Sequence, residues 1–137
     1  MKGNSWWKDA EVLSLGFVLA LALTGCGKRD SLQSQTEWAG RCSQVGYEPY
    51  PMIMIVSERN GQELSGLLHW PSLRNSKTRF KAVVEDRDVY LTEYELIEGS
   101  GLLLPSLYQG KLMGETLGGT WRYAGHEGTF HLERIKK

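Results

Sequence analysis

Residues 107–133 read LYQGKLMGETLGGTWRYAGHEGTFHLE, and three runs within this stretch alternate apolar or glycine residues with polar ones. Alternation with a period of two brings the apolar residues of a run onto one face of a β-strand. Glycine-containing turns at 112–115 and 125–128 separate the runs. The stretch therefore predicts strands at about 107–112, 115–123 and 128–135 that are joined by hairpins.

The chain upstream of this stretch contains further short alternating runs between turn residues. Asn60-Gly61 marks one of these turns, because this dipeptide favours the tight turns of β-hairpins. A charged turn follows at 85–88. About eight strands with hairpin connections predict an all-β fold, a small antiparallel up-and-down barrel whose closure leaves no sheet edge. The five upstream strands are expected at about 37–43, 51–57, 63–70, 77–84 and 87–95.

One face of each strand from the third onward carries the large apolar side chains, together with about one glycine or alanine per strand. A glycine leaves room for a neighbouring aromatic ring and permits the sharp coiling that a small barrel needs. We therefore expect these faces to line one closed interior. The residues expected there are Leu64, Gly66, Leu68, Trp70, Thr78, Phe80, Ala82, Val84, Val89, Leu91, Glu93, Tyr108, Gly110, Leu112, Leu117, Gly119, Trp121, Gly128, Phe130 and Leu132.

Two apolar segments need cover. Residues 52–56 are apolar on both faces, so their outer side must be covered by the segment at 99–107, by a partner or by the membrane. Residues 99–105 form a predicted loop that contains three consecutive leucines. These leucines could cap the barrel, cover the second strand, or contact membrane or a partner. We expect them to cap the barrel.

The N-terminal segment has the pattern of an export signal. Residues 12–23 read VLSLGFVLALAL, and Lys2 and Lys8 precede them. An uncharged run of 12 residues is too short to span a hydrocarbon core of about 30 Å as a helix, but it has the length of a signal-peptide apolar region. Leu23-Thr24-Gly25-Cys26 follows this run and resembles the lipobox of bacterial lipoproteins.

This resemblance implies that Cys26 receives a diacylglyceryl group, that the chain is cut before it, and that the new amine is acylated. Two or more acyl chains give lasting membrane anchoring. The expected organisation is a helical signal peptide at 1–25, a flexible polar tether at 26–36 that begins with lipidated Cys26, and a barrel domain at 37–135. Gly27 stands where an Asp often retains Gram-negative lipoproteins at the inner membrane. The implied location is the cell envelope, at the outer membrane facing the periplasm if the source is Gram-negative.

The barrel itself resembles the calycin architecture of lipocalins and avidins. The resemblance rests on an early Trp38, about eight meandering strands and a late Gly119-Thr120-Trp121. In lipocalins an early Trp lies at the barrel base, and a basic residue of the last strand packs over it. The resemblance assigns these parts to Trp38 and Arg134, although Thr36 stands where the lipocalin pattern has Gly.

Composition excludes several classes of function. Sixteen Lys and Arg balance sixteen Asp and Glu, whereas nucleic-acid binders usually carry a basic excess. The histidines lack the spacing of a metal site, and no nucleophile-elbow or phosphate-loop motif is present. We therefore predict no nucleic-acid partner, no metal, no cofactor and no catalytic residue. Cys42, which is unpaired if Cys26 is lipidated, is expected to be buried as a small apolar residue.

Four aromatic residues and one carboxylate share the predicted inward face, namely Trp70, Tyr108, Trp121, Phe130 and Glu93. The aromatic residues either fill the core or line a small apolar pocket that contains a few polar groups. An inward carboxylate is costly unless it is paired or hydrogen-bonded. Glu93 therefore lies at the barrel mouth in contact with water or an Arg, anchors a ligand, or acts as a general acid or base.

These observations favour a non-enzymatic binding module that is anchored in the cell envelope through lipid. Its expected ligand is small and apolar and is held by the five inward residues. The first alternative is a structural or assembly lipoprotein that binds an envelope protein through its outer surface and the second strand. The second alternative is an envelope hydrolase.

Overall fold

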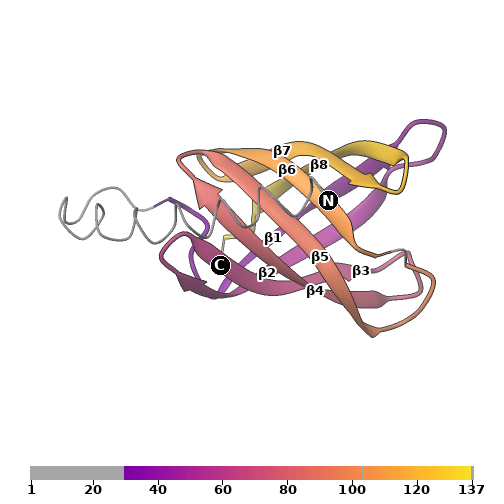
Figure 1. Ribbon diagram of the computed structural model, residues 1–137, viewed down its shortest axis with the longest axis horizontal. Coiled ribbons are helices and arrows are strands. Elements are labelled where there is room, and N and C mark those ends of the chain that lie inside the picture. Colours follow the sequence, from indigo (N-terminus) through magenta and orange to yellow (C-terminus); the bar gives the residue numbers. More distant parts are fainter. Residues whose placement is uncertain (1–29, 103, 137) are drawn as a thin grey trace.

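The computed structural model describes residues 30–102 and 104–136, and these form a closed barrel of eight antiparallel strands (Figure 1). Each strand pairs with the next along the chain, and β8 pairs back with β1. The predicted all-β, up-and-down barrel is confirmed. The strands are β1 (Thr36–Gln44), β2 (Tyr50–Asn60), β3 (Glu63–Trp70), β4 (Ser76–Glu85), β5 (Asp88–Glu98), β6 (Ser106–Met113), β7 (Thr116–Tyr123) and β8 (His126–Arg134).

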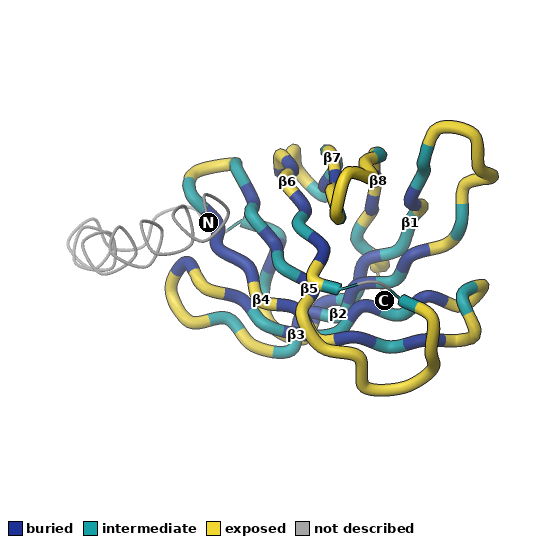
Figure 2. The backbone as a smooth tube through the Cα atoms, turned by 45° about the vertical axis from the view of Figure 1, so that its right-hand side comes forward, coloured by how far each residue is buried: buried dark blue, intermediate teal, exposed yellow. Residues whose placement is uncertain are grey.

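Burial alternates along the strands, and the buried positions face one interior (Figure 2). Every large apolar side chain that the sequence placed inside is less than 9% exposed, and Glu93 and Thr78 are buried with them. The predicted inward face is therefore confirmed. The first two strands add Trp38, Cys42, Met52, Met54 and Val56 to the same core.

Interior glycines lie opposite aromatic side chains in the register of neighbouring strands. A Cβ atom at Gly66 or Gly128 would collide with a backbone carbonyl of the strand on its other side and with the ring opposite. The missing side chains therefore bring the strands close together and make space for the rings. The glycine–aromatic pairs are Gly66–Phe80, Gly119–Phe130 and Gly128–Trp121.

The barrel has two distinct ends. Short turns at 61–62, 86–87 and 114–115 lie at one end, which we call the closed end. The connections β1–β2, β3–β4, β5–β6 and β7–β8 lie at the other end, on the right in Figure 1, which we call the mouth. Within the residues that the structure describes, no helix is long and apolar enough to cross a membrane.

The last hairpin differs from its prediction. Its turn is at Ala124 and Gly125, both of which have a positive φ, so β8 begins at His126 and not at residue 128. β5 is also longer than predicted and runs to Glu98, although its register with β6 ends at Glu93 and Ser106.

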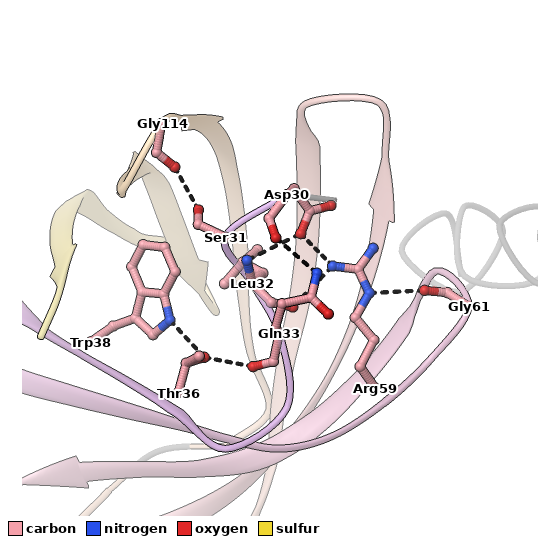
Figure 3. Close-up of polar contacts among 9 residues, drawn as sticks. All are labelled: Asp30, Ser31, Leu32, Gln33, Thr36, Trp38, Arg59, Gly61 and Gly114. Carbon is pink, nitrogen blue, oxygen red and sulfur yellow. Dashed lines mark hydrogen bonds and ion pairs between the residues drawn. The ribbon is translucent and has the colours of Figure 1, made fainter. Parts of the chain in front are cut away.

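The segment before β1 closes the barrel and corrects the predicted domain boundary. Leu32, which was assigned to the flexible tether, is fully buried against the core. Arg59 donates to the carbonyl oxygen of Leu32 at 2.9 Å, to Asp30 and to the carbonyl oxygen of Gly61 (Figure 3). Burial of one leucine and these bonds hold residues 30–36 on the barrel, so the domain includes them. Residues 1–29, with the predicted signal peptide and Cys26, lie outside the described residues.

Trp38 and Arg134, the two residues named by the calycin resemblance, are partners in the β1–β8 register. The indole Nε1 of Trp38 donates to Thr36 Oγ1 at 3.1 Å (Figure 3), and the Arg134 guanidinium donates to Glu115 at 3.3 Å. The backbone N–H of Ile135 donates to the carbonyl oxygen of Glu37 at 2.8 Å. The beginning of β1 and the end of β8 are therefore adjacent at the closed end.

The two apolar segments have different surroundings. Leu102, in the β5–β6 connection, packs against the buried core, so this connection caps part of the mouth as expected. On β2, Ile53 and Ile55 point outward and are half-buried between β1 and β3. In the register of these strands, Ile55 lies between Glu37 and Leu67.

Candidate functional site

A pocket of about 260 Å³ opens at the mouth of the barrel. It combines six aromatic side chains with one buried carboxylate, so it is largely apolar with a polar group inside. Small-molecule sites have this composition. Its lining residues are Gln44, Tyr47, Tyr50, Trp70, Leu73, Glu93, Gly101, Leu102, Ser106, Tyr108, Trp121, Tyr123 and His126.

Glu93 is the polar centre of this pocket, and it is only 3% exposed. Its Oε2 accepts hydrogen bonds from Trp70 Nε1 at 2.8 Å and from Thr78 Oγ1 at 2.6 Å. Its Oε1 accepts a hydrogen bond from the Tyr108 hydroxyl at 2.9 Å. The three donors come from β3, β4 and β6, so the register of four neighbouring strands fixes the orientation of the carboxylate.

Burial raises the pKa of Glu93 above the usual value for glutamate, and the hydrogen bonds from Thr78, Trp70 and Tyr108 partly oppose this effect. The three donors are neutral and therefore stabilise the ionised carboxylate without cancelling its charge. Among the described residues that line the pocket there is no lysine or arginine. When Glu93 is ionised, the pocket therefore carries a negative charge, and no lysine or arginine among its described lining residues balances that charge.

The Cys42 thiol and the Tyr50 and Tyr108 phenols remain neutral at pH 7. Burial raises the pKa of Cys42 to about 12, and its hydrogen-bonded partner Tyr50 is also raised, mainly by burial. Burial and the nearby Glu93 raise the pKa of Tyr108 as well. Cys42 is a buried free thiol, in agreement with the prediction of a small apolar residue.

The aromatic rings pack in defined pairs. The Tyr50 and Trp70 rings have centroids 5.8 Å apart and planes inclined at 53°. Tyr108 and Phe130 make an edge-to-face contact with centroids 5.5 Å apart and planes at 86°. Such pairs stabilise each other beyond the area they bury. The wall of the pocket is therefore held in place before any ligand arrives.

The structure brings together four of the five residues predicted for a ligand site, because Trp70, Glu93, Tyr108 and Trp121 all line the pocket. Phe130 is not part of the lining, and it supports Tyr108 from within the core. The position of Phe130 follows from its place in β8, two residues further from the mouth than Gly128.

Sequence reasoning missed several lining residues near the mouth. Tyr50 and Tyr123 continue the inward alternation of β2 and β7. Tyr50 lies one residue before the predicted second strand, whereas Tyr123 lies within the predicted seventh strand and continues its inward face two residues beyond Trp121. Tyr47, Leu73 and Leu102 lie in loops, where alternation gives no information about direction. Trp121 also donates from Nε1 to the carbonyl oxygen of Ser43 at 3.1 Å, which joins β7 to β1 at the rim.

A wider hollow of about 1080 Å³ lies at the closed end, between the turns and residues 30–34. Its lining is mostly polar and charged, with Val84 and Leu112 as exceptions, so it lacks the aromatic enclosure of the mouth. Within residues 30–102 and 104–136, no group of three or more His, Cys, Asp or Glu is placed to hold a metal ion. No protein-family model matches the chain, and no curated protein matches it.

Proposed function

We propose that this chain is a lipid-anchored protein of the cell envelope whose barrel binds a small, largely apolar ligand at its mouth without catalysing a reaction. The observation that carries the proposal is the aromatic pocket that surrounds buried Glu93. A closed barrel of eight strands is just wide enough to be filled by side chains or to hold one small ligand. Here the mouth of the barrel leaves space between its aromatic side chains.

The size of the pocket limits the ligand. About 260 Å³ lies just below the range of about 300–1,000 Å³ that is typical of drug-sized ligands. A molecule with one ring or a short chain fits this volume, whereas a long acyl chain does not. The Glu93 carboxylate is held by three hydrogen bonds, an arrangement that supports a fixed anchoring group.

The direction of the chain supports an anchored binding module. Asp30 and Leu32 lie at the closed end, where Arg59 binds both of them, so the first described residues are at the end of the barrel opposite the mouth (Figure 3). A barrel that is anchored through Cys26 would therefore direct its mouth away from the membrane. Ligands would reach the pocket from the aqueous side.

Nuclear magnetic resonance of the full chain, labelled with ¹⁵N-tryptophan and reconstituted in lipid nanodiscs, tests ligand binding. The probe is 3-phenylpropan-1-ol, which is small, largely apolar and uncharged. Saturable shifts of the Trp70 and Trp121 indole signals are expected because both side chains line the pocket. The Trp38 signal serves as the internal control, since its indole lies at the closed end. Mouth signals that do not move up to millimolar probe would contradict the proposal.

One observation favours the alternative of a protein partner. β5 continues past its register with β6, and its last residues expose Tyr94, Leu96 and Ile97. A partner strand could pair with such an extended segment. Ile97→Ser should weaken association with an envelope protein and leave probe binding unchanged, and loss of probe binding would contradict this assignment.

A further inference from the structure

We propose that the preferred ligand of the mouth pocket carries an ammonium group that binds Glu93 while its apolar part lies against the aromatic wall. This inference rests on the proposed function, since it names the chemical class of the ligand for the same pocket. It follows from the charge, the hydrogen bonds and the rings around Glu93.

The carboxylate of Glu93 keeps acceptor capacity for a ligand. The two oxygens of a carboxylate offer about four acceptor positions, and protein side chains take three of them. Two of these bonds go to Oε2 and one goes to Oε1. Oε1 is therefore the atom to which an ammonium N–H would donate.

The charge of the pocket selects a cation. A buried carboxylate is costly unless it is paired, hydrogen-bonded or protonated, and the described lining residues supply neutral donors but no lysine or arginine. A ligand ammonium would supply the missing positive charge. A ligand carboxylate would be placed beside a second anion and would be repelled. An uncharged ligand would leave the charge unbalanced.

The aromatic wall favours the same class of ligand. Trp and Tyr rings attract a cation over their faces because the ring quadrupole is negative there. The Tyr50 and Trp70 rings lie with centroids 5.8 Å apart in the wall beside the carboxylate to which Trp70 donates. Tyr108 contributes both a ring to the wall and the donor to Oε1. The aromatic wall and the carboxylate together match an ammonium group on an apolar stem.

Three probes with the same stem separate the contributions. They are 3-phenylpropylamine, 3-phenylpropan-1-ol and 3-phenylpropanoate, titrated into the full chain in nanodiscs with the Trp70 indole signal as readout. We expect the amine to bind at least about tenfold more tightly than the alcohol, which corresponds to one buried cation–ring contact. We expect the carboxylate to bind more weakly than either.

Glu93→Gln is the matched variant, because glutamine has the same shape and its amide oxygen can accept from Trp70 and Thr78. It should bring amine binding to within about twofold of alcohol binding in the same variant. Alcohol that binds as tightly as amine in the wild-type chain would overturn the inference and leave the proposed function in place. Failure of all three probes would instead overturn the proposed function.

A pH titration of the wild-type chain provides a second test, which does not require that Glu93→Gln folds. Protonation of Glu93 removes the anion, so amine affinity should fall as the pH is lowered from 8 through the raised pKa of Glu93, while alcohol affinity stays constant. Cys42, Tyr50 and Tyr108 face Glu93 and stay neutral over this range because their pKa values are raised. The variant His126→Gln is the control for the histidine at the rim, and the fall in amine affinity should persist in it. A pH-independent amine affinity would also overturn the inference.

Discussion

Trp121 lies directly opposite Gly128 in the β7–β8 register, and its indole occupies the space that a side chain at Gly128 would need. A Cβ atom built at Gly128 would lie 2.6 Å from Trp121 Nε1, and it would also collide with the carbonyl oxygen of Ser43. That carbonyl is the acceptor of the Trp121 indole N–H. One glycine therefore permits both the position of the ring and its hydrogen bond to β1.

Gly128→Ala should destabilise the barrel by about 1–3 kcal/mol, because overpacking a filled site forces the backbone or the ring to move. Urea unfolding monitored by tryptophan fluorescence measures the change. Gly118→Ala on the neighbouring strand is the control, because its Cβ atom would meet nothing closer than 3.3 Å. Equal losses in the two variants would show that close packing at Gly128 is not the cause.

Trp121→Ala should lower the free energy of unfolding by about 3–5 kcal/mol, since it leaves a large cavity in the wall of the barrel. The residue is only 7% exposed. Thr120→Ala changes the adjacent, outward-facing residue and should cost no more than about 0.5 kcal/mol. A loss below about 1 kcal/mol for Trp121→Ala would contradict its role in the core.

Leu32→Ala should lower the free energy of unfolding by about 2–4 kcal/mol, the usual loss for a buried leucine. A leucine in a flexible tether would give no measurable loss on the same change. Chemical denaturation distinguishes the two, with exposed Ser34→Ala as the control in the same segment.

The pH dependence of stability should differ between the wild-type chain and Glu93→Gln. Because the pKa of Glu93 is raised in the folded state, the folded protein binds more protons than the unfolded chain between the usual glutamate pKa and the raised value. Stability from this group is full below that window and falls as the pH rises through it. The wild-type chain should therefore gain stability relative to Glu93→Gln on acidification from pH 7 to the usual glutamate pKa.

The pKa of Glu115 is shifted in the opposite direction from that of Glu93. Comparing the wild-type chain with Glu93→Gln cancels the contribution of Glu115 to the pH dependence of stability. Its pKa is lowered, first by the hydrogen bond from Lys136, so its contribution is lost only as the pH falls below the usual glutamate range. Both proteins keep Glu115. A difference in stability that does not change on acidification from pH 7 to the usual glutamate pKa would contradict a raised pKa at Glu93.

Cys26→Ser should abolish incorporation of labelled palmitate in a bacterial host and block cleavage of the precursor. Electrophoretic mobility and membrane fractionation measure both effects. Cys42→Ala is the control, because this buried thiol lies inside the barrel and is not available for lipidation. Continued labelling of the Cys26→Ser chain would exclude Cys26 as the lipid attachment site.

Sequence alternation predicted the barrel because each strand buries one face and exposes the other. Leu68, Trp121 and Phe130 could be placed inside from parity alone, and so could Glu93. The ends of the strands were predicted less accurately. β8 follows a turn in which Ala124 has a positive φ, and an alanine in a sequence does not indicate this conformation.

The site was predictable only where it lies on strands. Alternation identified Trp70, Glu93, Tyr108 and Trp121 as inward residues. It could not show which side chains donate hydrogen bonds to Glu93, because those bonds depend on the register between four strands. Leu32 was missed for a related reason. One leucine among polar residues has no periodicity, and its burial together with the hydrogen bond from Arg59 across the closed end appears only in the folded barrel.

The beginning of β1 and the end of β8 are adjacent at the closed end. The strand pairs of the barrel therefore do not depend on the point at which the chain begins. A linker that leads from the end of β8 round to Asp30 would make the polypeptide circular, and the circle could then be opened at Gly46, in the exposed β1–β2 connection. Such a permuted protein would keep every strand pair, yet its new ends would emerge beside the pocket. A reporter group attached at these ends would lie beside the pocket and could respond to a ligand that binds there.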